Sequence, residues 1–180
     1  MRFEETPLAG AWVIDLEPHS DERGWFARNF DAEEFKARGL EPCIAQCNAS
    51  FSVRRDTIRG MHYQAEPHGE SKLVRCVRAA SFDVAVDLRP ESSTYCHWHG
   101  VELSAENRRA FYLPKGVAHG FQTLDGDCEV LYQMGARYVV EAARGVRWDD
   151  PAFAIKWPAA SGERTISDRD RAYPDFQVER

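Results

Sequence analysis

The 180-residue sequence contains no apolar run that approaches the ~18 residues of a membrane-spanning helix, and its first residues include no apolar signal segment. It also lacks an excess of basic residues, because 23 Lys and Arg stand against 29 Asp and Glu, giving a net charge of −6. This balance argues against general binding to nucleic acid or to an anionic membrane surface. The sequence therefore predicts a cytoplasmic protein with no nucleic-acid or membrane partner.

A C-x-x-C pair is also missing: the five cysteines form an odd set, which favours reduced thiols over a disulfide framework. Lysine is scarce, with only Lys36, Lys72, Lys115 and Lys156 beside nineteen arginines. Apolar residues are plentiful, since 43% of the residues are hydrophobic and 12% are aromatic. Such a chain can bury a core, and its length predicts a single domain over residues 1–180.

One short helix is predicted near the N-terminus, after a loop over residues 18–24 that is rich in turn formers. Asp31 is suited to cap the helix, and Glu34 three residues later completes a capping box. Phe35 supplies an inward contact, and Gly39 is placed where a helix of about two turns would end.

After residue 40 the sequence changes to short apolar segments broken by Gly, Pro and Asp. Residues 81–88 alternate with their apolar side chains on one face, as in a β-strand. Further strands are expected at 12–14, 72–78, 98–103, 110–113, 120–124 and 128–134. Many short strands with almost no helix predict a mainly β fold, an antiparallel sandwich or small barrel. From residue 149 the composition predicts an irregular C-terminal arm over residues 149–180.

Two of these segments carry polar residues where a sheet should be apolar. In 46–50, Gln46, Asn48 and Ser50 share one face, which indicates either the solvent side of an edge strand or the lining of a polar site. In 57–64, strict alternation places His62 and Arg59 on opposite faces, unless Gly60 introduces a bulge that brings them together.

A metal site is the first alternative that the histidines raise. The P-x-G-x-x-H spacing that ends at His119 resembles the second motif of the cupin barrels, in which the histidine often binds a metal. His97, His99 and Glu102 imitate the first motif only loosely, because they lie too close to the second and their Glu spacing is short. These departures disfavour a metal site.

Tyr132 and the segment 166–171 can each be explained by a structural role alone. Tyr132 lies on the same face of the predicted strand 128–134 as its apolar neighbours, so the pattern places it in the core. It becomes a candidate acid only if it lies beside a base in a polar cavity. The segment 166–171, which contains Asp170, has the composition of an exposed charged turn.

Taken together, the segments resemble the dTDP-4-dehydrorhamnose 3,5-epimerase family, cupin-like sugar-nucleotide epimerases, over nearly the whole chain. The matching segments are, in order, 21–24 with Phe26, 46–48, 59–64, 72–74, 82–89, Leu103 with 107–109, 118–121, 131–132, 150–151, 157–158 and 167–170. The resemblance implies a cupin-like double-sheet antiparallel β-barrel, or jelly roll. Its parts would be an N-terminal dimer-exchange region with a short helix at 1–45, the barrel at 46–148, and the C-terminal arm.

The same resemblance implies the chemistry. The family's substrate is a nucleoside diphosphate linked to a 4-keto-6-deoxyhexose, whose C3 and C5 protons are acidified by the carbonyl, so neither a redox cofactor nor a metal is expected. His62 would be the base, Asp170 would hold its tautomer, and Lys72 would face the C4 oxygen where charge develops. Tyr132 would return a proton on the opposite face.

The binding residues also follow from the resemblance. Arg59, His119 and Arg169 would contact the diphosphate or lie near the ligand, and Gln46 and Asn48 would line the site. The family dimerises by exchanging N-terminal strands, which would bring Arg23 and Phe26 of one subunit into its partner's site.

Arg28 departs from the family pattern, because typical members carry there a Glu that helps to recognise the nucleotide base. The reversal of charge leaves a different nucleotide open, such as a CDP-sugar, and epimerisation at C3 or C5 alone is also open. An alternative of another class is a non-catalytic or metal-binding cupin; the joint presence of His62, Lys72, Tyr132 and Asp170 favours the enzyme.

Overall fold

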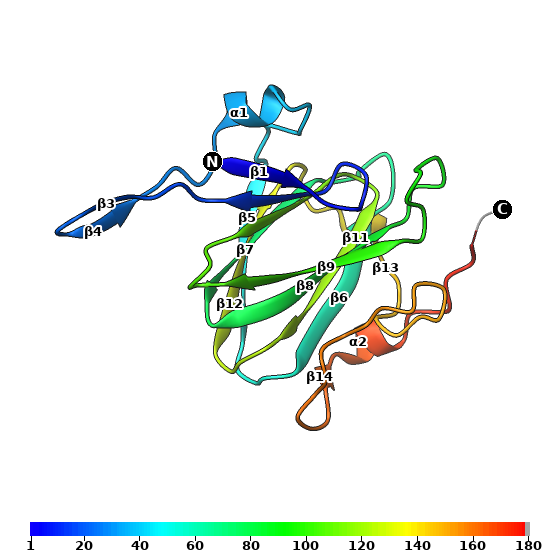
Figure 1. Ribbon diagram of the computed structural model, residues 1–180. Coiled ribbons are helices and arrows are strands. Elements are labelled where there is room, and N and C mark those ends of the chain that lie inside the picture. Colours follow the sequence, from blue (N-terminus) through cyan, green and yellow to red (C-terminus); the bar gives the residue numbers. More distant parts are fainter. Residues whose placement is uncertain (179–180) are drawn as a thin grey trace.

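The computed structural model describes residues 1–178, which form two antiparallel sheets that face each other (Figure 1). The first sheet has the order β1-β2-β10-β7-β12-β5, with bounds Arg2–Glu5, Trp12–Asp15, Ala110–Leu113, Lys72–Arg78, Cys128–Met134 and Gln46–Ser52. The second has the order β13-β6-β11-β8-β9, with bounds Ala143–Gly145, Thr57–Gln64, Val117–Thr123, Ala80–Asp87 and Trp98–Ser104. The predicted mainly β jelly roll is confirmed, as a sandwich of two sheets rather than a closed barrel.

Helices are few and short. They are α1 (Ala32–Lys36), the 3₁₀ turn η1 (Val140–Ala142) and α2 (Asp168–Arg171), which follows the short strand β14 (Thr165–Ile166). β14 pairs in parallel with β6 and so attaches the C-terminal arm to the second sheet. No helix within residues 1–178 has the length and apolar character needed to cross a membrane.

The main core lies between the sheets, where Phe111 and Val130 of the first sheet belong to one buried cluster with Leu103 and Phe121 of the second. The outer faces are covered as well. Phe35 of α1 packs on the first sheet, and Phe153 of the C-terminal arm packs on the second. Because both faces of its central strands are covered, the second sheet buries all of β11.

Helix α1 begins where the sequence predicts. The Asp31 side chain accepts hydrogen bonds from the backbone N–H groups of Glu33 and Glu34, and Gly39 has the positive φ of 71° that suits a helix stop. The capping-box role of Glu34 was wrong: its carboxylate turns toward the amino group of Met1, at 3.9 Å, and toward Arg38, at 3.7 Å.

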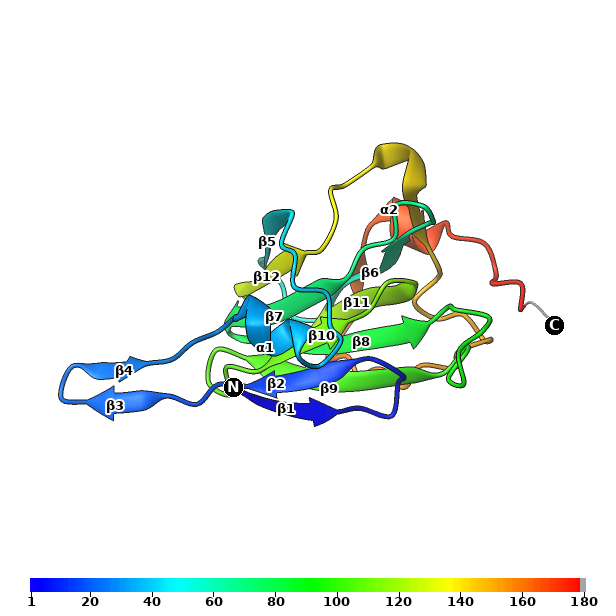
Figure 2. The same cartoon turned by 90° about the horizontal axis from the view of Figure 1, so that it is seen from above.

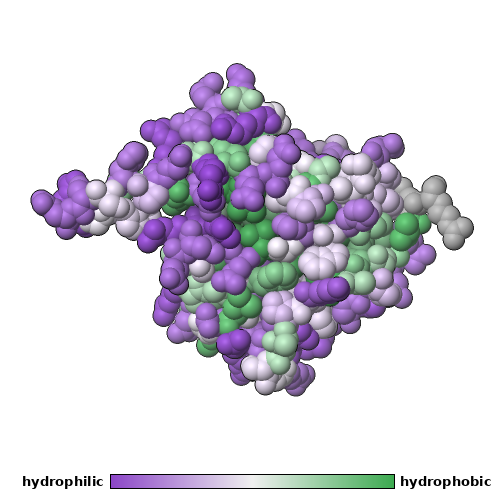
Figure 3. Space-filling view, viewed as in Figure 1, coloured by the Kyte–Doolittle hydropathy of each residue, from purple (hydrophilic) through white to green (hydrophobic). Residues whose placement is uncertain are grey.

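The predicted loop at 18–24 is instead a hairpin of β3 (His19–Asp21) and β4 (Gly24–Phe26). It projects from the sandwich, with a hydrophilic tip (Figures 1, 2 and 3). Turn residues in the sequence signalled the reversal but not the flanking strands, because a strand that buries nothing on its own chain has no apolar alternation. Phe26 is 73% exposed and Trp25 is 49% exposed, which is unusual for residues of their size.

Asp87, at the end of β8, is a fully buried carboxylate that organises the loop after its strand. It accepts hydrogen bonds from the Arg89 guanidinium at 2.7 and 2.8 Å and from the hydroxyls of Ser92 and Thr94, each at 2.6 Å. Burial opposes its ionisation, but these donors outweigh burial and lower its pKa to about 2.

We expect Asp87→Asn to lower the free energy of unfolding at pH 7 by about 2 kcal/mol or more, because the charged hydrogen bonds are lost. The folded-state pKa lies below the unfolded value, so this stabilisation is present above pH ~4 and is lost as the pH falls toward 2. Urea unfolding of both proteins at pH 7 and pH 3 measures it. Asp149→Asn, at an exposed pair with Arg147, is the control and should change stability by less than ~0.5 kcal/mol; a difference for Asp87→Asn that stays constant with pH contradicts the assignment.

Candidate functional site

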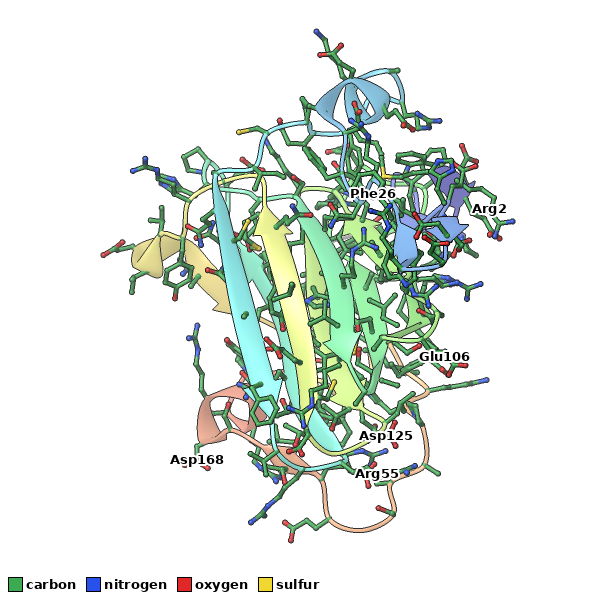
Figure 4. All side chains as sticks on the ribbon, turned by 90° about the vertical axis from the view of Figure 1, so that its left-hand side faces the viewer. Arg2, Phe26, Arg55, Glu106, Asp125 and Asp168 are labelled. Atoms are coloured by element: carbon green, nitrogen blue, oxygen red, sulfur yellow. The ribbon has the colours of Figure 1, made fainter. Side chains whose placement is uncertain are left out.

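A cavity of about 670 Å³ opens between the two sheets. The first sheet contributes residues of β5, β7 and β12 to its wall, and the second contributes residues of β6 and β11. Helix α2 closes one side; Asp168 marks this helix in Figure 4. The polar residues that line the cavity are Asn48, Ser50, Thr57, Arg59, His62, Glu70, Lys72, His119, Tyr132, Thr165, Ser167, Arg169 and Asp170.

A bulge in β6 brings Arg59 and His62 to the same cavity. His119 of β11 pairs with His62, while Phe121, two residues on, pairs with Arg59, so β6 carries one extra residue between these pairs. Gly60 permits the bulge, because its φ is +125° and a Cβ there would lie 2.5 Å from the Cα of Gly120. The bulge that the sequence left open is therefore present.

The His62 ring is held by Asp170 of α2. Its Nε2 lies 2.7 Å from Asp170 Oδ1, and the other carboxylate oxygen accepts the Gly60 backbone N–H at 3.2 Å. Burial opposes ionisation of Asp170, but the bonds to His62 and Gly60 outweigh it and lower the Asp170 pKa. An ionised Asp170 fixes Nε2 as the protonated nitrogen, which leaves Nδ1 unprotonated and able to accept a proton.

The prediction of an exposed charged turn at 166–171 holds for Ser167, Asp168, Arg169 and Arg171, which are exposed, but was wrong for Asp170. Asp170 is only 4% exposed, because Ser167 caps the short helix α2 and turns this carboxylate inward. The Asp170 carboxylate can be buried because it has hydrogen-bond partners inside the protein. Composition alone does not indicate such partners.

Tyr132 faces the same cavity from the opposite sheet. Its hydroxyl lies 3.0 Å from the Ser50 hydroxyl, and its ring lies 5.9 Å from the His119 ring, edge to face. Burial raises the pKa of Tyr132, so the phenol keeps its proton at neutral pH. It is therefore an uncharged proton donor rather than only a core residue.

Lys72, at the start of β7, is buried with its ammonium group on the cavity wall. Nζ donates to the backbone oxygen of His62 at 2.7 Å and lies 3.2 Å from Glu70 Oε1. Burial lowers the pKa of Lys72, and the Glu70 carboxylate opposes that effect. The Lys72 amino group thus lies beside the backbone of the candidate base.

His119 and Arg59 add basic groups to the same wall. His119 Nε2 lies 2.8 Å from Asp83 Oδ1, and the other Asp83 oxygen accepts the Ser81 hydroxyl at 2.6 Å. Burial lowers the pKa of His119 more than Asp83 raises it. Arg59 donates to the Ser52 hydroxyl and to a backbone oxygen of β5.

The structure brings together most of the predicted residues but not all. Eight line the cavity: Asn48, Arg59, His62, Lys72, His119, Tyr132, Arg169 and Asp170. Gln46 instead accepts the Tyr138 backbone N–H at 2.9 Å. Because β5 is an edge strand, its exposed Asn48 both faces solvent and borders the cavity, so the two readings of 46–50 each hold in part.

The remaining predicted residues, Arg23, Phe26 and Arg28, lie on or beside the hairpin, on the other side of the sandwich from α2 (Figures 1 and 4). Arg23 pairs with Asp21, and Arg28 pairs with Asp31 at 2.9 Å. Within one chain, these three residues do not line the cavity.

The sequence missed Asp83 and Glu70, both buried beside cavity residues. The position of Asp83 could have been noticed, because a carboxylate inside a predicted strand that becomes buried needs a hydrogen-bond partner. Within residues 1–178, no group of three His, Cys, Asp or Glu side chains is placed to hold a metal ion. His97 is exposed and precedes β9, whereas His99 is half-buried with its ring against that of Phe111.

The relatives agree with this fold over almost its full length. A dTDP-4-dehydrorhamnose 3,5-epimerase of Methanothermobacter thermautotrophicus is 47% identical over 172 residues, covering 94% of this chain and 91% of that protein. The crystal structure of such an epimerase from Elizabethkingia anophelis matches with a TM-score of 0.94 and 35% identity, covering 98% and 96% of the two chains. An epimerase structure from Bacillus anthracis with TDP and PPi bound matches with a TM-score of 0.91 and 36% identity, covering 97% and 99%.

Jelly-roll architecture, a titratable cavity between the sheets and these relatives define a cupin-like carbohydrate epimerase, an enzyme of the isomerase class. More particularly, residues 5–178 match the family model for dTDP-4-dehydrorhamnose 3,5-epimerase, and the chain belongs to that family. The resemblance noted in the sequence is confirmed.

Proposed function

We propose that the cavity binds a nucleoside-diphosphate 4-keto-6-deoxyhexose, foremost dTDP-4-dehydro-6-deoxyglucose, and inverts C3 and C5 to give dTDP-4-dehydrorhamnose. The observation that carries the proposal is the placement of His62 and Tyr132 on facing sheets around one cavity. A sugar ring held between the sheets would meet a base on one face and a proton donor on the other. Inversion at a carbon requires that arrangement, because the proton leaves one face and returns to the other.

The proposed steps follow from the groups present. His62 Nδ1 takes a proton from the carbon next to the C4 carbonyl, and ionised Asp170 stabilises the imidazolium that forms. The electron pair moves to the C4 oxygen as an enolate, where the Lys72 ammonium meets the charge. Tyr132 then gives its proton to the opposite face of the carbon. A metal ion and a redox cofactor have no part in these steps.

Diphosphate recognition is assigned to the basic groups of the cavity wall. Arg59, His119 and Arg169 lie around the cavity, and guanidinium groups suit phosphate oxygens through paired hydrogen bonds. The anionic ligand would favour the protonated form of His119 that its burial disfavours. Local basic groups in this way reconcile a net charge of −6 with an anionic substrate.

The functional unit in this proposal is a cytoplasmic homodimer that exchanges its hairpins. Phe26 and the Arg23 side chain are highly exposed on a hairpin that projects away from its own chain, so a partner's cavity is where they can be used. Gln46 and Asn48 on the neighbouring edge strand would meet the exchanged hairpin and the bound nucleotide.

The test of the proposed function is incubation with dTDP-4-dehydro-6-deoxyglucose in deuterated water after exhaustive chelation. Deuterium at C3 and C5 with inversion supports the proposal, and label at one carbon only identifies a single-site epimerase. Absence of label from all candidate 4-keto sugars favours a non-catalytic cupin. Activity that disappears on chelation and returns with zinc or iron contradicts the metal-free steps.

Arg28 provides a separate prediction about the nucleotide. A Glu at this position can accept a hydrogen bond from thymine N3–H, whereas an Arg only donates and suits the N3 acceptor of cytosine. We therefore expect the wild type to prefer dTDP less strongly than relatives with Glu do, and to bind CDP well, and Arg28→Glu to shift preference toward dTDP. Titrations of dTDP, UDP, CDP and GDP measure it.

Arg28→Ala is the control for this prediction, because it removes the pair with Asp31 without supplying an acceptor. If the wild type binds dTDP tightly and Arg28→Glu leaves the preference unchanged, Arg28 serves only the helix cap and the base is read elsewhere.

A further inference from the structure

Glu70 is a buried carboxylate on the cavity wall to which the proposed steps give no role. It is 7% exposed, and its Oε1 lies 3.2 Å from the Nζ of Lys72, which is 5% exposed. Both side chains border the cavity. A buried ion pair is costly to desolvate, so its presence at this place calls for a function.

The contacts of Lys72 leave one N–H group unassigned. An ammonium group has three N–H donors, and in Lys72 one meets the backbone oxygen of His62 while another faces Glu70. These two acceptors fix Nζ between the base strand and the cavity wall. The third donor is left for a ligand.

Glu70 itself is only half satisfied. Its Oε2 is buried and makes no hydrogen bond with any group of residues 1–178. A carboxylate that served only to stabilise the fold would be expected to have both oxygens paired, as Asp87 does. Among the described residues, the one partner of the Glu70 side chain is Lys72.

From this geometry we infer that Glu70 is a positioning residue, which keeps Lys72 protonated and aimed at the C4 oxygen of the substrate. The catalytic relevance of this role rests on the proposed function, while the coupling of Glu70 to Lys72 does not. Without the carboxylate, burial would favour a neutral amine that cannot meet the enolate charge.

The other charged and titratable groups around Lys72 do not replace Glu70. Arg59, His62 and His119 come from the second sheet, Tyr132 from β12, and Arg169 with Asp170 from α2. A protonated histidine or an arginine would disfavour the ammonium, and Asp170 is engaged by His62 and Gly60. Burial raises the pKa of Tyr132 and lowers that of Lys72, so Lys72 loses its proton first as the pH rises.

The direct test is an NMR titration of the lysine side chains without substrate. The chain has only four lysines, so Lys72→Arg assigns the Lys72 signal. We expect Glu70→Gln, which keeps an amide oxygen but removes the charge, to lower the titration midpoint of Lys72 by about one pH unit or more. Glu70→Asp should lower it less, and Glu66→Gln, at an exposed glutamate nearby, should leave it unchanged.

The kinetic test follows the same variants. In Glu70→Gln the alkaline limb of kcat should move to lower pH by the same amount, so that kcat falls by about tenfold at a pH above the Lys72 midpoints of both proteins, with little change in KM. If Glu70→Gln does not fold, the wild type still decides: the Glu70 carboxyl carbon signal must respond at the pH where Lys72 titrates.

The inference is overturned if the titration midpoint of Lys72 is the same in Glu70→Gln as in the wild type, or if the Glu70 carboxyl carbon signal does not change at the pH where Lys72 titrates. Either result leaves the proposed epimerisation unaffected. Failure of the wild type to exchange deuterium into any 4-keto sugar contradicts the proposed function instead, and the titration still reports on the pair.

Discussion

His62→Ala is expected to reduce epimerisation by on the order of 10²–10⁴-fold or more, and to stop deuterium exchange into the sugar at both carbons. The reason is that the His62 ring combines an unprotonated nitrogen with a carboxylate, Asp170 at 2.7 Å, that stabilises its protonated form. The His119 ring is also paired with a carboxylate, but it is buried and burial lowers its pKa, which disfavours proton uptake. Exchange measured by NMR in deuterated water separates proton removal from later steps.

The matched control is His68→Ala, because His68 is exposed and its hydrogen bonds to Gln64 and Ala65 are made by its backbone groups. That variant should keep wild-type rates. Exchange that persists in a folded His62→Ala protein would assign the base to another group, and His119 would be the next candidate because it borders the same cavity.

Tyr132→Phe is expected to reduce formation of the inverted sugar by a similar factor, on the order of 10²–10⁴-fold, while exchange at the substrate carbon continues. His62 can still remove and return a proton on its own face, so label enters without inversion. The phenol is the group lost, since phenylalanine keeps the ring contact with His119 but not the hydroxyl bonded to Ser50.

Tyr112→Phe serves as the comparison, because Tyr112 is also buried but its hydroxyl accepts the Glu41 backbone N–H away from the cavity. It should cost stability of about 1 kcal/mol and leave the ratio of exchange to inversion unchanged. A Tyr132→Phe protein that inverts the sugar at the normal rate would return Tyr132 to a packing role.

The sandwich was predictable because its strands carry their own signals. The segments 72–78, 110–113 and 128–134 were predicted with the bounds observed. Strand β11 begins three residues earlier than its predicted start at 120, since Val117 and Ala118 are buried and already pair with β8. Strands β13 and β14 were not predicted, because pairing with β6 rather than any local pattern defines them.

The site was predictable only in part. Polar residues inside β6 marked it, and the effect of Gly60 was anticipated. The partnership of His62 and Asp170 could not be obtained from alternation or spacing, because it joins residues 108 positions apart; the family resemblance supplied it. Glu70 was missed because a glutamate just before a strand has the composition of an ordinary surface turn.

In the proposed dimer, the projecting hairpin separates nucleotide recognition from proton transfer. Its residues at 23–28 pack little on their own chain, so substitutions there cost the sandwich little stability, whereas His62, Lys72 and Tyr132 belong to paired strands of the two sheets. If the hairpin contacts the nucleotide as proposed, substitutions that adapt the chain to a different nucleotide can therefore accumulate there one at a time. Variants with a changed nucleotide preference can in this way arise without any variant along the series losing its fold or its catalytic groups.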